Sequence, residues 1–219
     1  MKLSLHNNLA IVFLISTILS CNNGADKQPT PGSANATSPG NKELSLSGRK
    51  NLVEEIKRLK VLFTSGNKEK IKSIFQFPLP DSTLAYYLED KSFDEDKKQS
   101  PDFLTEALFD RYYDKISKSI ELDRFNAFFE HIPADSLLVK DRVQTEVADK
   151  DEPCMQFYDL SYEEGQLSIT IGSNHNTNYV NKSKSEEDDS VGDACEYAVI
   201  WEFTFDGKRL LFKRQTAAG

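Results

Sequence analysis

Apolar residues recur at helical spacing early in the chain and alternate with polar residues later. A first helix is predicted to begin near Ser47, because residues three and four apart share one side of a helix. Gly66 suits the end of this helix, where the backbone turns left-handed. The residues of the apolar side are Leu52, Ile56, Leu59 and Phe63, with Val53 and Leu62 beside them.

A second, shorter helix is predicted after Asn67, whose side chain suits the capping position. It ends at residues 77–80, because neither proline of this stretch continues a helix. The next residues predict a short strand within 82–88 and an exposed, charged turn at 91–99.

Two more helices are predicted before the spacing of apolar residues changes from helical to alternating. Ser100, Pro101 and Asp102 form a helix start, with a capping hydroxyl, a proline in the first turn and an acid at the positive end of the dipole. A further helix fits residues 122–132 and ends at Pro133. The inward side chains are Leu104, Leu108, Tyr112 and Ile116 in the first, and Phe125, Phe128, Phe129 and Ile132 in the second.

Alternation with a period of two predicts a sheet in the second half of the chain. Its strands cover residues 139–147, 155–162, 167–171, 197–205 and 210–214. Hairpin turns are expected at residues 163–165 and at Asp206-Gly207. The larger apolar side of the fourth strand, which carries Trp201, is expected to lie against the helices. The predicted fold class is α+β, with N-terminal helices packed on a curved antiparallel sheet that ends in two hairpins.

This order of elements resembles the nuclear-transport-factor-like, or cystatin-like, roll. The resemblance rests on the Gly66-Asn67 junction into residues 77–79, the helix at 103–116 and the hairpin that carries Trp201, and it spans residues 47–216. It implies either a small enzyme, such as an isomerase, dehydratase or epoxide hydrolase, or a binding module. No catalytic signature of the family matches this chain position by position, so no functional residue is carried over.

The first twenty residues have the parts of a secretory signal, with Lys2 followed by an apolar run at 9–19 that is too short to span a bilayer. Residues 18–20 (Ile-Leu-Ser) precede Cys21, and this order resembles the lipobox of bacterial lipoproteins. The resemblance implies cleavage before Cys21 and its modification with acyl chains such as palmitate, which anchor a protein stably. A plain secreted protein, or a short N-terminal membrane helix with a chance cysteine, is the alternative.

The sequence thus divides into a signal peptide at 1–20, a disordered tether at 21–46 and a single α+β domain at 47–219. The tether is rich in Asn, Gly, Ser, Thr and Pro and buries too little apolar surface to offset its ordering entropy. Asn22 lacks the acidic character that retains lipoproteins in the inner membrane of enterobacteria. The expected location is therefore the cell envelope, on the outer membrane and facing the periplasm.

The net charge of the chain limits the kinds of partner that it is expected to bind. The chain carries a formal charge of −8, and loss of the single charged residue of the signal, Lys2, leaves −9. An acidic domain repels nucleic acid, so nucleic acid is not an expected partner. The expected partners are the membrane, through the lipid on Cys21, and an unidentified envelope protein or small ligand. No cofactor is expected, because the sequence has no glycine-rich phosphate loop.

Two cysteines remain once Cys21 is lipidated. Cys154 and Cys195 are expected to form a disulfide, since the periplasm allows such bonds to persist. Two buried free thiols are the alternative, and a zinc site is disfavoured because the thiols are isolated. In a simple meander the two cysteines begin strands about 10 Å apart. A bridge then requires the segments ahead of these strands to curl together, or a different strand order.

Candidate chemistry is sparse. Asp159 is the nearest approach to a general base, His131 follows an aromatic helix, and His175 lies among asparagines. The long segment 173–194 contains an acidic run at 186–189, which is expected to be a solvated tip, with calcium binding as the alternative.

Three functions remain open. The first is a lipid-anchored periplasmic binding or scaffolding module. The second is a small pocket enzyme on the same roll that uses Asp159 or His131. The third is a structural envelope protein within a larger complex. An inward carboxylate or imidazole in an apolar interior favours the enzyme, whereas a filled interior favours the module.

Overall fold

The computed structural model describes residues 44–179 and 195–219. The predicted signal peptide, Cys21, most of the tether and the acidic run at 186–189 lie outside the described residues. Within those residues, no helix combines the length and the apolar character needed to cross a membrane.

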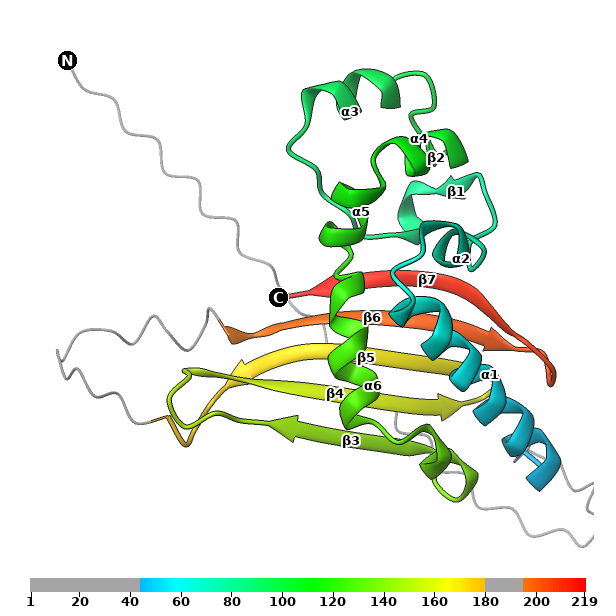
Figure 1. Ribbon diagram of the computed structural model, residues 1–219, viewed down its shortest axis with the longest axis vertical. Helices are drawn as coiled ribbons and strands as arrows, with labels where there is room; N and C mark the ends of the chain where they lie inside the picture. The colour runs from blue at the N-terminus through cyan, green and yellow to red at the C-terminus, as the bar shows by residue number, and fades with distance from the viewer. Residues whose placement is uncertain (1–43, 180–194) are drawn as a thin grey trace, which may run out of the picture. The chain divides into compact units, whose positions relative to one another are not determined.

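The domain has an antiparallel sheet of five strands covered on one face by helices, which confirms the α+β fold class (Figure 1). The strands follow one another in the order β3-β4-β5-β6-β7, so the sheet is a simple meander. Their bounds are Arg142–Val147, Cys154–Glu163, Gln166–His175, Tyr197–Phe205 and Leu210–Ala218. Alternating side chains therefore divide between a helix-covered inner face and an outer face on which Figure 1 places no helix.

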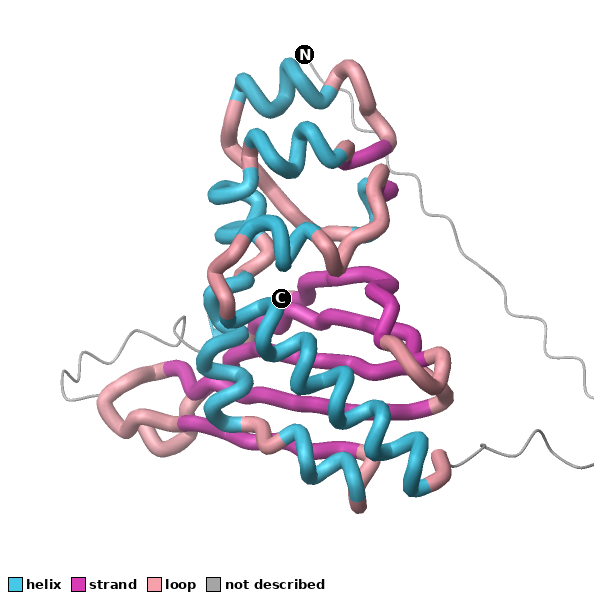
Figure 2. Tube along the Cα trace, turned by 45° about the vertical axis from the view of Figure 1, so that its right-hand side comes forward, coloured by secondary structure: helices cyan, strands magenta, loops and turns pink. Residues whose placement is uncertain are grey.

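The helical part comprises six α-helices and three short 3-10 helices among the described residues. The α-helices are α1 (Leu46–Thr64), α2 (Lys68–Lys72), α3 (Lys91–Lys97), α4 (Glu106–Arg111), α5 (Tyr113–Ser119) and α6 (Phe125–His131). The 3-10 helices are η1 (Asp81–Thr83), η2 (Leu122–Arg124) and η3 (Ala134–Leu138). Figure 2 shows α1 and α6 crossing the sheet, while α2 to α5 lie beyond its β7 edge. A second sheet pairs β1 (Leu79–Pro80) with β2 (Phe103–Leu104).

The predicted apolar side of α1 is buried, and Asn67 caps α2 by accepting a hydrogen bond from the Lys70 amide at 3.1 Å. Gly66 has a φ of +61°, the left-handed turn that separates the two helices. Helix α1 begins at Leu46, one residue before the predicted boundary of the domain, because Ser45 caps it.

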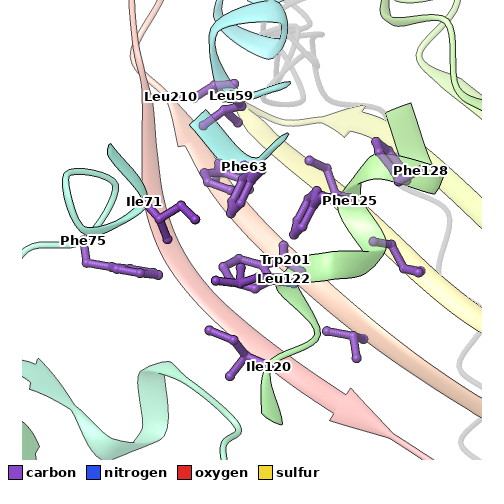
Figure 3. Close-up of a cluster of buried hydrophobic side chains, with 14 of the residues drawn as sticks. Leu59, Phe63, Ile71, Phe75, Ile120, Leu122, Phe125, Phe128, Trp201 and Leu210 are labelled. Carbon is purple, nitrogen blue, oxygen red and sulfur yellow. The ribbon is translucent and has the colours of Figure 1, made fainter. Parts of the chain in front are cut away.

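The inner face of the sheet meets these helices through aromatic rings (Figure 3). Phe63 of α1 stacks on Phe125 of α6, with ring centroids 3.8 Å apart. Both rings meet Trp201 of β6 edge-on at 5.3 Å. The predicted apolar side of β6 therefore lies against the helices, as expected from its alternation.

The segment between α2 and α4 differs from prediction. Residues 82–88 form no strand: η1 is followed by a single bridge between Leu84 and Gln215. The predicted turn at 91–99 contains α3, which Asp90 caps and which buries Phe93 between the rings of Tyr86 and Tyr112. That buried aromatic gives a charged stretch the apolar contact that a short helix needs.

The helix predicted from Ser100 begins later. Phe103–Leu104 pairs with Leu79–Pro80 as β2, so the chain is extended there, and Thr105 instead caps α4. The predicted strand at 139–147 also begins late, at Arg142, because η3 occupies the preceding residues and leaves Val139 82% exposed. The last hairpin is present, but the centre of its turn is Gly207-Lys208 and not the predicted Asp206-Gly207, because the Asp206 amide donates to the Arg209 carbonyl.

The Cys154–Cys195 disulfide is present, with a Cα–Cα distance of 5.3 Å. Cys154 opens β4 opposite His175, and Cys195 lies two residues ahead of β6. The Ser173 hydroxyl donates to the Cys195 carbonyl at 2.6 Å, which draws the segment ahead of β6 across the end of β5. The bridge therefore spans a simple meander because this segment curls over the intervening strand.

Candidate functional site

Asp159 lies on the outer face of β4, away from the helices. Its neighbours Tyr158 and Leu160 face inward and are buried, as strand alternation requires. The Arg142 Nε donates to the Asp159 carboxylate at 2.7 Å, and Asp159 is 6% exposed beneath this guanidinium. The pair is complete without a substrate, and the carboxylate does not enter the helix-covered interior.

His131 is the last residue of α6 and is exposed. Its ring stacks on Tyr158 with centroids 5.2 Å apart. Tyr158 belongs to the inner face, so the sheet separates His131 from Asp159 and the two predicted candidates do not form one site. His175 ends β5 and is exposed, opposite Cys154.

The helix-covered interior is filled by side chains. Trp201, Phe125, Phe128 and Phe203 are each fully buried there. The Trp201 Nε1 is the one buried side-chain nitrogen or oxygen without a hydrogen-bond partner in the part of the chain that the structure describes.

A polar network closes the end of the sheet beside the disulfide. Arg124 donates to Glu121 at 2.8 Å, to the side chain of Gln156 and to the Gly172 carbonyl, and its guanidinium lies 5.8 Å from the Tyr197 ring. Burial raises the pKa of Tyr197, and its hydrogen bond to Glu121 raises it further. A phenol with a raised pKa stays protonated at neutral pH and offers no phenolate, and the Arg124 guanidinium already has hydrogen-bond partners. This network therefore holds η2 to the sheet.

A pocket of about 330 Å³ lies between the end of α1, α2, α5 and the start of α6. Its floor consists of Phe63, Ile71 and Leu122, all buried. Figure 3 shows these three side chains around Trp201, so the floor is the outer surface of the aromatic core. An apolar floor of this kind is typical of small-ligand sites, whose volumes run from about 300 to 1,000 Å³.

The rim of this pocket is polar. Tyr113, Lys118, Asp123 and Asn126 contribute to it, and the last three are exposed. Burial raises the pKa of Tyr113, so its hydroxyl is a neutral hydrogen-bonding group at neutral pH. Across residues 44–179 and 195–219, the side chains of Lys118, Asp123 and Asn126 make no hydrogen bond or ion pair.

The backbone between α5 and α6 creates this rim. Glu121 has a φ of +56°, an uncommon conformation for a residue with a side chain, and it turns the chain sharply after α5. Lys118 precedes this turn and Asp123 follows it, so two residues of opposite charge line one pocket. No sequence pattern predicts this site, because the left-handed turn at Glu121 brings its residues to the end of α1.

No group of three or more histidine, cysteine, aspartate or glutamate side chains is placed to hold a metal ion among the residues described.

Comparisons with protein-family models, curated proteins and solved structures found no match to this chain.

Proposed function

We propose that this chain is a lipid-anchored protein of the bacterial cell envelope whose folded domain binds a small ligand. The pocket between α1, α5 and α6 is the observation that supports binding, because it combines a buried apolar floor with unpaired polar groups at its mouth. The order of residues before Cys21 supports the anchor. The domain is then a binding member of the nuclear-transport-factor-like roll, held on the outer membrane and facing the periplasm.

The geometry supports the binding module over the enzyme. Asp159 is paired with Arg142 on the outer face, and His131 stacks on a tyrosine at the other side of the sheet. General acid–base catalysis needs such a group within hydrogen-bond reach of a bound substrate. The pocket contains neither residue, so the alternative enzyme would need a different set of groups.

The anchor is tested on the full chain expressed in a bacterial host. We expect intact mass spectrometry to find residues 1–20 removed and acyl chains on Cys21. Cys21→Ala should abolish the added mass and release the protein from the membrane fraction. The Cys154→Ala/Cys195→Ala double variant is the matched control and should keep the lipid; an unprocessed cytosolic wild-type product contradicts the anchor.

Binding is tested by thermal unfolding of the mature chain in detergent, with and without the small-molecule fraction of a host envelope extract. Asn126→Trp places a large ring at the mouth of the pocket from an exposed position, so the fold should survive. We expect the extract to raise the Tm of the wild type but not of Asn126→Trp. Equal shifts, or no shift in either protein, contradict a binding function of this pocket.

A further inference from the structure

Unpaired opposite charges distinguish this pocket from its surroundings. A neighbouring pocket of about 440 Å³ also has charged groups at its lining, but there Lys115 pairs with Asp90 at 2.5 Å and Lys68 with Asp110 at 3.6 Å. Lys118 and Asp123 share a pocket with no such partner in the described part of the chain. Their charges therefore remain available to a ligand that carries both signs.

The end of α1 adds to the negative side of the pocket. Helix α1 ends at Thr64, and Thr64 and Gly66 both line the pocket. The C-terminal end of a helix carries a partial negative charge, which favours a cation nearby. Asp123 and this helix end together suit an ammonium group, whereas Lys118 suits a carboxylate.

The floor and the volume restrict the rest of the ligand. Phe63, Ile71 and Leu122 offer an apolar surface to which an uncharged side chain can transfer from water. At about 330 Å³ the pocket lies near the lower end of the range for ligand sites, too small for a lipid or a long peptide.

Resting on the proposed binding function, we infer that the pocket between α1, α5 and α6 binds a small zwitterion with an apolar side chain, the class of apolar amino acids and dipeptides. The carboxylate of the ligand pairs with Lys118, its ammonium pairs with Asp123, and its side chain covers the floor. Asn126 and Tyr113 supply neutral hydrogen-bonding groups at the same mouth.

Calorimetric titration of the mature chain in detergent tests this inference with leucine, phenylalanine and leucyl-leucine. Leucinamide lacks the carboxylate charge and N-acetylleucine lacks the ammonium charge. We expect each to bind the wild type about two- to fivefold more weakly than leucine, the range that an exposed ion pair provides. Equal affinities for leucine, leucinamide and N-acetylleucine overturn the inference, and this comparison needs no variant protein.

Charge variants assign each end of the ligand. Lys118→Gln should lower the affinity for leucine by about two- to fivefold and leave the affinity for leucinamide unchanged. Asp123→Asn should lower the affinity for leucine by a similar factor and leave the affinity for N-acetylleucine unchanged. Lys98→Gln and Asp102→Asn, at exposed positions outside the pocket, are the matched controls and should change nothing.

The outcomes separate the inference from the function on which it rests. If the wild type binds none of these compounds, but the envelope extract still stabilises it and not Asn126→Trp, the ligand class is wrong and the binding function stands. If the extract also has no pocket-dependent effect, both are wrong.

Discussion

The two faces of the five-stranded sheet use the same strands in opposite ways. On the inner face, Trp201 and Phe203 are completely buried, and both pack against Phe63 of α1. On the outer face, Glu202 lies between these two residues in sequence and is 9% exposed, although none of the described helices covers it. Aromatic packing shields one face, whereas long cationic side chains shield the other.

The outer face shows how a carboxylate is held at low exposure without a covering helix. Glu202 accepts hydrogen bonds from Arg214 and from the Gln166 amide at 2.8 Å, and Lys213 lies 3.9 Å away. Asp159 and Arg142 repeat this arrangement nearer the other edge. Stability is therefore expected to depend mainly on the inner face, and low exposure of an acid on the outer face is no sign of a reactive site.

Trp201→Ala, on the inner face, should give the largest loss of stability. Removal of the indole leaves a cavity among Phe63, Phe125 and Phe212 and should lower the free energy of unfolding by about 3–5 kcal/mol. Chemical denaturation followed by circular dichroism measures this, because Trp201 is the only tryptophan and its fluorescence is lost. Thr204→Ala, on the outer face of the same strand, is the control and should change stability by less than about 0.5 kcal/mol.

The disulfide joins the start of β4 to the segment ahead of β6 and should stabilise both faces together. Replacement of Cys154 and Cys195 by serine releases a constraint across 41 residues and should cost about 4 kcal/mol in the chain-entropy description. Denaturation with and without a reducing agent measures this. Reduction should lower the stability of the wild type and leave the double variant unaffected; equal stability of the oxidised proteins contradicts the expected contribution.

The inner face and its covering helices were predictable from sequence because each obeys one period over many residues. Alternation from Val199 to Phe205 fixes both sides of β6 at once, and intervals of three and four do the same for α1. The disulfide was predictable from the number of cysteines together with the oxidising compartment that the resemblance to a lipobox implies. Its geometry was predictable only as two alternatives, a curl ahead of the strands or a different strand order, because the curl ahead of β6 depends on a hydrogen bond from Ser173 to a backbone carbonyl.

The segment between α2 and α4 escaped prediction because its elements are short and depend on distant contacts. Helix α3 has seven residues and one buried side chain, Phe93, whose partners Tyr86 and Tyr112 lie outside the helix. Strands β1 and β2 have two residues each. The pocket escaped for a related reason: it depends on the left-handed Glu121, a residue type that gives no sequence signal for that conformation.

Acid should weaken the outer face through Glu202. The hydrogen bond from Arg214 lowers the pKa of Glu202 below its usual 4.5, against the opposing effect of burial. A lowered folded-state pKa stabilises the fold above the unfolded value and loses this effect as pH falls through the folded value. Glu202→Gln should therefore cost about 1 kcal/mol at pH 7, and the difference from wild type should shrink below about pH 4.5. Denaturation at a series of pH values measures this, and a difference that grows in acid contradicts it.

Asp159→Asn, on the outer face, should give the smallest loss of stability. It is therefore the most sensitive test of the difference between the two faces. Asparagine keeps an oxygen that accepts the Arg142 hydrogen bond, and Arg142 is itself 64% exposed, so water already screens the pair. The free energy of unfolding should fall by about 0.5 kcal/mol at low salt and by less at high salt. The pocket-dependent Tm shift should not change, because Asp159 lies on the other side of the sheet. Denaturation at two salt concentrations tests the first expectation; loss of the Tm shift in this variant would mean that the outer face takes part in function.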